Sequence, residues 1–147
     1  MNKDEAKWLL ESLRKIQFFS VFTLDNIDSI LKHFQKITYP KGKNIINEGE
    51  PGEAFFIIHS GKVRVLRKKA LFLRQQLAVL GPGDFFGEMS LVSDRPATAT
   101  IAPSETAELY VLLKTDFNIV LKANPKMSEQ LHRIAEERKL DAAIKSI

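Results

Sequence analysis

The chain has no cysteine among its 147 residues, and this absence excludes several kinds of function. Without thiols there is no disulfide framework, no cysteine nucleophile and no cysteine-based zinc site. Long apolar runs are missing as well, since none reaches the roughly 18 residues that a membrane-spanning helix needs. The first residues are too acidic and polar for a secretory signal. We therefore expect a cytoplasmic protein with no membrane partner.

The length and composition indicate one domain with a single core. The chain is 44% hydrophobic and 27% charged, which is typical of a globular domain and not of a disordered segment. The net charge of +4 could indicate a nucleic-acid partner, but the positive residues are scattered along the chain. The densest group has the character of a strand end and a solvated hairpin, and comprises Arg64, Arg67, Lys68, Lys69 and Arg74.

Both ends of the chain show helical patterning. Apolar residues recur at helical spacing between residues 8 and 16, and Thr23 stands where the N-cap of a further helix belongs. Near the other end Thr115 can cap a helix, and Asn124 followed by Pro125 predicts a second start. The pattern therefore predicts an N-terminal helical segment over residues 1–33 and C-terminal helices over residues 114–147. The apolar face of the last helix is expected to pack on the central segment or on a second copy.

The segment between them, residues 34–113, consists of short apolar runs separated by glycine and proline. Such spacing predicts an α+β fold built on an antiparallel β-roll, of the double-stranded β-helix or jelly-roll kind. Strands are expected at residues 36–39, 44–46, 54–59, 62–66, 76–80, 99–101 and 108–112. Alternation of apolar side chains predicts a core that includes Val63, Val65, Leu77, Val79 and Phe86.

The segment with the clearest chemistry is residues 81–91, which read Gly-Pro-Gly-Asp-Phe-Phe-Gly-Glu-Met-Ser-Leu. Gly87 lacks a Cβ and lets the backbone approach a ligand closely. A helical turn over residues 88–91 would offer N–H groups to a phosphate. Glu88 carries two acceptor oxygens, which suit a sugar hydroxyl and not a phosphate. Together these features predict a sugar-phosphate site.

With residues 95–101, Arg-Pro-Ala-Thr-Ala-Thr-Ile, this segment resembles the phosphate-binding cassette of the cyclic nucleotide-binding domain family. The family includes catabolite-activator-type regulators, regulatory subunits of protein kinase A and cyclic-nucleotide-gated channels. The resemblance covers about residues 16–140, including the turn sequences at 39–42, 48–52 and 60–63. It implies a stand-alone bacterial-type sensor of cAMP or cGMP. Ligand contacts are expected at Phe86, Gly87, Glu88, Met89, Ser90, Arg95, Ala97 and Thr98.

The resemblance assigns roles to parts of this segment. It implies that Glu88 holds the ribose 2′-hydroxyl and that an arginine holds the cyclic phosphate. It also implies that the last helix closes over the base, through Leu131, Ile134, Arg138 or Leu140.

The arginine is where this chain departs from the family pattern. The family's arginine position falls on Ala97, whereas Arg95 lies two residues earlier, ahead of Pro96. Two alternatives stay open. Either Arg95 reaches the phosphate through a remodelled loop, or the phosphate meets only N–H groups and the hydroxyls of Ser90, Thr98 or Thr100. Losing a charge-assisted contact would weaken binding by about one to two orders of magnitude.

These alternatives lead to two main hypotheses about function. The first is a sensor in which a bound cyclic nucleotide repositions the C-terminal helices. The second is a degenerate domain of the same fold that acts in protein interaction or as a homodimer. Too few residues follow Leu140 for a helix-turn-helix, so DNA binding by the chain itself is not expected. Nor is catalysis or a metal or cofactor site, because the three histidines lie in separate elements.

Overall fold

The computed structural model describes residues 1–145, and the chain divides into two compact units. One unit is Phe34–Lys114, and the other combines Met1–His33 with the segment that begins at Thr115. Each unit is described in turn.

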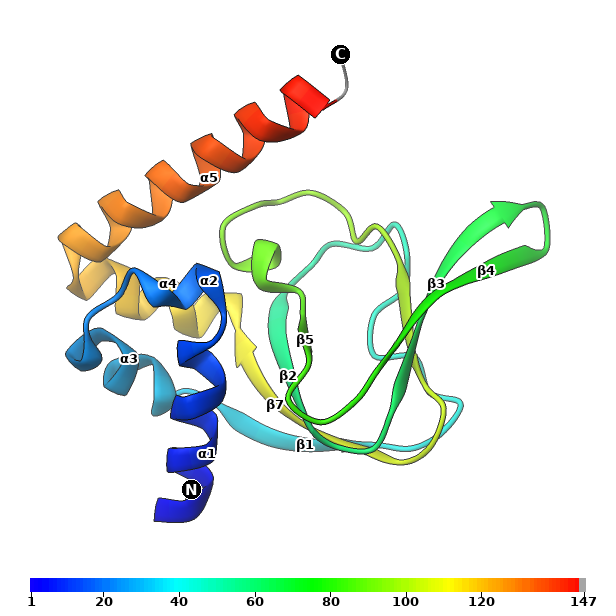
Figure 1. Ribbon diagram of the computed structural model, residues 1–147, viewed down its shortest axis with the longest axis horizontal. Helices are drawn as coiled ribbons and strands as arrows, with labels where there is room; N and C mark the ends of the chain where they lie inside the picture. Colours follow the sequence, from blue (N-terminus) through cyan, green and yellow to red (C-terminus); the bar gives the residue numbers. More distant parts are fainter. Residues whose placement is uncertain (146–147) are drawn as a thin grey trace. The chain divides into compact units, whose positions relative to one another are not determined.

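Seven antiparallel strands in two sheets make up the unit Phe34–Lys114 (Figure 1). The first sheet has the order β1-β7-β2-β5, with bounds Gln35–Tyr39, Ala107–Leu113, Ala54–Ser60 and Phe85–Phe86. The second has the order β4-β3-β6, with bounds Leu73–Leu80, Val63–Ala70 and Thr100–Pro103. The expected mixture of helices with an antiparallel roll is confirmed.

The interior of this unit is an apolar cluster to which both sheets contribute. Strand β2 supplies Ala54, Phe56 and Ile58, whose side chains alternate with those on its other face. The rings of Phe56 and Phe86 stack with their centroids 4.9 Å apart. Burying each such large apolar side chain contributes about 1.5–3 kcal/mol. The remaining buried members are Val63, Ile101, Ala107, Leu109 and Val111. Stacking on β2 thus fixes β5, the strand that leads into the predicted ligand site.

The structure corrects the expected strands and core at three places. Residues 44–46 form no strand and contribute only an isolated bridge from Ile46 to Ile101. The short strand β5 was not expected. Leu77 and Val79 are not core residues, since they are 44% and 50% exposed. Their strand β4 lies at the edge of its sheet in a hairpin that projects from the roll, so alternation there does not mark burial (Figure 1).

Five helices make up the other unit: α1 Lys3–Arg14, α2 Gln17–Ser20, α3 Leu24–Leu31, α4 Lys114–Ala123 and α5 Pro125–Lys145. Thr23 is the N-cap of α3 and forms a capping box with Asn26, as predicted in part from the sequence. Thr115 does not cap a helix, because α4 already begins at Lys114. Within the described residues, no helix is both long and apolar enough to cross a bilayer.

An aromatic cluster joins the helices from the two ends of the chain. The ring of Phe117 on α4 lies 6.2 Å from that of Phe18, which also contacts Phe19 and Phe22 edge-on. On α5, Leu131 is buried and Ile134 is half-buried. The side chains of Arg138 and Leu140, which the resemblance suggested for base contact, lie outside the described residues.

Candidate ligand-binding site

A tight turn over residues 81–84 begins the candidate site. The backbone N–H of Gly81 donates to Asp84 Oδ2 at 2.9 Å, and that of Asp84 donates back to the Gly81 carbonyl at 3.0 Å. Gly83 has φ +88° and donates its N–H to the carbonyl of Ile58 at 2.8 Å. The turn is therefore held to β2 before β5 begins, and the segment that follows starts from a fixed point.

Gly87 occupies a position that only glycine tolerates. Its φ is +82°, in the left-handed region, and a Cβ placed there would lie 2.7 Å from the carbonyl oxygen of Ala54. The chain thus passes directly against the backbone of β2. It then enters a 3₁₀ helix, η1, over Glu88–Leu91.

Helix η1 packs closely on the loop before β2. A Cβ on Gly52 would lie 2.9 Å from the Cβ of Ser90 and would also overlap its Oγ. Leu91 is fully buried, whereas Glu88, Met89 and Ser90 are half-buried. Residues 88–90 therefore stay accessible on a turn whose far end is anchored.

The loop that carries Arg95, Ala97 and Thr98 is held by backbone hydrogen bonds. The N–H of Ala97 donates to the Glu50 carbonyl and that of Gly49 donates to the Ala97 carbonyl, both at 2.8 Å. Ala97 is thus held through both its N–H and its carbonyl, and Ala97 is the position where the family's arginine would stand. Ala97 is half-buried, and Thr98 is exposed.

The hydroxyl of Thr100 has a structural partner. It is buried and accepts a hydrogen bond from the N–H of Glu48 at 3.0 Å. The carboxylate of Glu48 in turn accepts from the N–H of Lys68 on β3 at 3.0 Å. Thr100 therefore stabilises the loop at residue 48, while the hydroxyls of Ser90 and Thr98 remain the ones nearer to solvent.

Two arginines compete for the role that Ala97 leaves open. Arg95 is exposed, and among the described residues nothing holds its guanidinium. Arg67 on β3 donates from Nε to the carbonyl oxygen of Thr98 at 3.2 Å, and no described carboxylate pairs with it. The strand pairing therefore places a second guanidinium one residue from Ala97.

The same loop is tied to the first residue of α4. Lys114 Nζ donates to the carbonyl of Ser93 at 3.1 Å and to Asp94 Oδ1 at 2.6 Å. This hydrogen bond and charge hold the pKa of the Asp94 carboxyl below its ordinary value. The N–H of Lys114 also donates to the Glu53 carbonyl at 2.8 Å. A displacement of the loop at residues 93–94 would therefore act directly on Lys114.

The structure shows where each of the predicted residues lies. Residues 86–90 form one continuous stretch, with Phe86 buried in the core and the next four half-buried. Arg95, Ala97 and Thr98 share one loop. The sequence reasoning missed Arg67 and Lys114 because their partners lie 31 and about 20 residues away. The basic run at residues 67–69 was visible in the sequence, but nothing local indicated that it meets Thr98.

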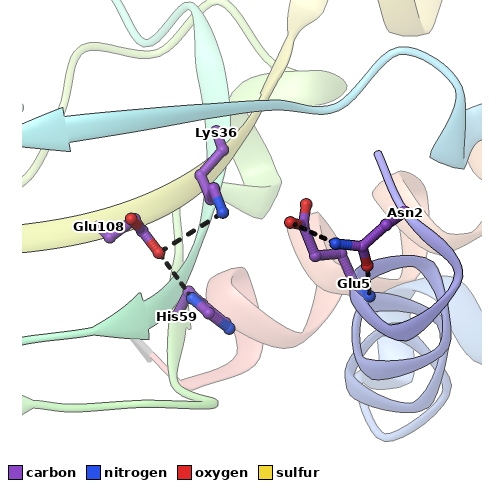
Figure 2. Close-up of polar contacts among 5 residues, drawn as sticks. All are labelled: Asn2, Glu5, Lys36, His59 and Glu108. Carbon is purple, nitrogen blue, oxygen red and sulfur yellow. Dashed lines mark hydrogen bonds and ion pairs between the residues drawn. The ribbon is translucent and has the colours of Figure 1, made fainter.

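Strand pairing also gives His59 a carboxylate partner that the sequence spacing did not predict. His59 Nδ1 lies 2.8 Å from Glu108 Oε1, and Lys36 Nζ lies 3.8 Å from the same oxygen (Figure 2). Within the described part of the chain, no three histidine or carboxylate side chains gather as a metal site would require. The pair therefore stabilises the first sheet.

Comparison with known proteins identifies the family. The profile of the family described as the cyclic nucleotide-binding domain matches residues 36–124, which include all of the segments above. The chain belongs to the cyclic nucleotide-binding domain family.

Two relatives and one solved structure indicate the range of proteins that carry such a domain. The Cyclic AMP receptor protein of Thermus thermophilus is 34% identical over 118 residues, which cover 80% of this chain and 55% of the relative. The cGMP-dependent protein kinase of Toxoplasma gondii is 35% identical over 123 residues, covering 83% of this chain and 12% of the kinase. The N-terminal domain of a transcriptional regulator from Streptomyces coelicolor A3(2) superposes with a TM-score of 0.78 at 25% identity, covering 92% and 95% of the two chains.

This cyclic nucleotide-binding domain therefore spans about half the length, or much less, of these two relatives. What the domain shares with them is the cyclic nucleotide-binding domain.

Proposed function

We propose that this domain binds a cyclic mononucleotide, cAMP or cGMP, between residues 86–90 and the loop 95–98, and that binding repositions the C-terminal helices. The observation that carries the proposal is the Gly87–Glu88 step. A left-handed glycine pressed on the Ala54 carbonyl presents a half-buried carboxylate and a short 3₁₀ turn, inside the segment that matches the family. The cysteine-free composition supports a cytoplasmic site of action.

Each part of a cyclic nucleotide has a suitable partner in this arrangement. Glu88 accepts hydrogen bonds and suits the ribose 2′-hydroxyl, because a carboxylate would repel the phosphate. The backbone of η1 and the Ser90 hydroxyl are donors that suit the phosphate oxygens. Relatives named for cAMP and for cGMP match the chain almost equally well, so both ligands belong in the test.

The positive charge at the phosphate comes from Arg67. Its Nε already bonds the Thr98 carbonyl, which holds the guanidinium at the loop beside Ala97. An arginine can still offer its two Nη groups to a phosphate while Nε is engaged. Arg67 and Arg95 are both exposed, but Arg95 has no such contact to hold its guanidinium at the loop.

Lys114 transmits the binding event. When a ligand draws the loop toward η1, Ser93 and Asp94 move with the loop. Their hydrogen bonds to Lys114 then pull on this residue, at which α4 begins. The size of the response is limited by the difference in ligand affinity between the two arrangements of the helices.

Calorimetric titration of the purified chain with cAMP and with cGMP tests the proposal. We expect saturable 1:1 binding of at least one of them, and Glu88→Gln should weaken it by about tenfold because a charged hydrogen-bond acceptor is lost. Glu105→Gln, at an exposed glutamate elsewhere in the same unit, is the matched control and should bind as the parent does.

No heat with either nucleotide at millimolar concentration contradicts the proposal. If Ala97→Arg then creates tight binding, the parent site lacks an effective cation, and the domain is a degenerate member of its family. A parent that binds while Glu88→Gln binds equally well would instead remove Glu88 from the site.

A further inference from the structure

The β3–β4 hairpin ends in three consecutive exposed apolar residues. Leu71, Phe72 and Leu73 are 83%, 97% and 62% exposed, at a tip that projects from the roll (Figure 1). Single exposed apolar side chains are ordinary, but a contiguous group of large ones on a projecting element indicates an interaction site. The core cluster of this unit contains none of the three.

The hairpin that carries this tip is strongly positive. Residues 62–80 contain no acidic residue, and their six basic residues are Lys62, Arg64, Arg67, Lys68, Lys69 and Arg74. The whole chain has a net charge of only +4, so the remainder of the chain is net negative. Glu48, which accepts from the N–H of Lys68, is the carboxylate that reaches this hairpin from the roll. Lys68, Lys69 and Arg74 lie one to three residues from the apolar tip, and we call these three residues the cationic collar.

The backbone conformation of the turn does not explain why phenylalanine stands at its apex. Phe72 has φ +69° and is the one non-glycine residue in this left-handed region among those described. A bulky side chain is disfavoured in that conformation, whereas glycine or asparagine would adopt it readily. A residue that the local geometry disfavours, and that is almost wholly exposed, indicates a role for its side chain outside the fold.

We propose that this hairpin tip, Leu71–Leu73 with Lys68, Lys69 and Arg74, docks on the surface of an anionic lipid bilayer. The tip residues enter the boundary between headgroups and acyl chains, and the lysines and arginine bind the lipid phosphates. Strands rise about 3.3 Å per residue, which sets the collar one to three residues behind the apex, at the depth of the headgroups when the tip is inserted. The contact is with the membrane surface and needs no spanning helix.

The shape and charge favour lipid over other occupants. A second copy of the chain would bring two hairpins of the same sign together, and this repulsion disfavours a dimer through the tip. An acidic protein surface would need a pocket shaped to receive the convex two-residue turn. A bilayer needs no such pocket, because lipids rearrange around an inserted apolar tip.

Co-sedimentation of the full chain with vesicles tests the proposal. We expect binding to phosphatidylcholine vesicles that contain phosphatidylserine, little binding to phosphatidylcholine alone, and weaker binding as salt is raised. Lys69→Gln should lower the partition coefficient about fivefold, because each cation near an anionic surface contributes about that factor. Lys43→Gln, in an exposed loop distant along the chain, should change it far less.

Phe72→Asn separates the docking role from any role in folding. Asparagine tolerates the left-handed conformation, so the melting temperature should stay level or rise, while vesicle binding falls about tenfold or more with the loss of the aromatic ring. Ile119→Asn removes another exposed apolar side chain, on α4, and should leave vesicle binding unchanged.

Absence of phosphatidylserine-dependent binding would overturn the proposal and leave an acidic protein as the occupant of the hairpin. Binding that persists unchanged in Phe72→Asn would overturn it equally. Nucleotide titration is independent of these outcomes, so failure of the docking proposal and failure of the ligand site can be told apart.

Discussion

At the scale of single residues, the backbone of Gly87 determines where the candidate site lies. The left-handed φ turns the chain out of β5, and the absent Cβ lets it pass the Ala54 carbonyl. Glu88 owes its position to this step, since it is the next residue and the first of η1.

We expect Gly87→Ala to destabilise the domain by about 1–3 kcal/mol, through a strained φ and a clash with a backbone atom that cannot move away. Nucleotide affinity should fall as well, because relief of the clash displaces η1. Gly81→Ala is the matched control: nothing lies within 4 Å of its added Cβ, and its φ is not left-handed. Thermal unfolding of both variants measures the difference, and equal stabilities would refute this account of Gly87.

The residues proposed for the cassette-like segment could be named from the sequence, whereas Arg67, the cation proposed for the phosphate, could not. Gly87, Glu88 and Ser90 stand in one short run whose chemistry is local. Arg67 meets Thr98 only because β3 pairs with β6, with Leu66 opposite Thr100, so the contact depends on strand register and not on spacing in the sequence.

At the scale of elements, the two candidate cations differ in what carries them. Arg67 stands on a paired strand and is bonded to the loop that it faces, while Arg95 stands in the loop itself and makes no such bond, although both side chains are exposed. A guanidinium held in place before binding loses less conformational freedom when the phosphate arrives.

We therefore expect Arg67→Gln to weaken cyclic nucleotide binding about tenfold and Arg95→Gln to weaken it far less. Arg64→Gln serves as the control, since Arg64 lies on the same strand and its Nε is engaged with Gln76 Oε1 at 2.7 Å. Calorimetry on the three variants decides the matter, and a larger loss in Arg95→Gln would assign the phosphate to the loop arginine.

The hairpin shows why the core prediction failed at Leu77 and Val79, although the strand predicted at residues 76–80 is present within β4. Alternating apolar residues in β4 have the pattern of a half-buried strand, and Val63 and Phe86 elsewhere do follow that rule. At Leu77 and Val79 the rule fails because β4 is an edge strand with no second layer over it. Alternation of apolar and polar residues indicates that the two faces of a strand differ in polarity, but it does not indicate that either face is buried by another layer.

At the scale of the whole molecule, Lys114 is the last residue of one compact unit and the first residue of α4. Its side chain bonds Ser93 and Asp94, next to the proposed ligand loop, while its backbone begins α4. Under the proposed function, we expect the ligand signal to pass through this residue and not through the core.

Lys114→Gln should leave nucleotide affinity within about threefold and reduce the ligand-induced change in hydrogen exchange of α4 and α5. An aspartate carboxylate is ionised at neutral pH, and the pKa lowered by Lys114 extends the ionised range of Asp94 to lower pH, so the contact is present at and above the ordinary aspartate range. It is lost only as pH falls through the lowered pKa, below the ordinary range of an aspartate carboxyl. The parent's exchange response should therefore be the same at pH 7 and pH 5, and an unaltered response in Lys114→Gln would exclude this route.

The aromatic contact between Phe18 and Phe117 has a consequence for how the protein is made. The whole roll lies between the two rings in sequence, so Phe18 cannot contact Phe117 until α4 has been synthesised. At ribosomal rates of about 5–20 residues per second, Phe18, Phe19 and Phe22 wait roughly 5–20 seconds on the nascent chain. During that interval strand β1 likewise lacks its partner strand β7. We therefore expect the packing of the helical unit to be completed only after translation has passed residue 117.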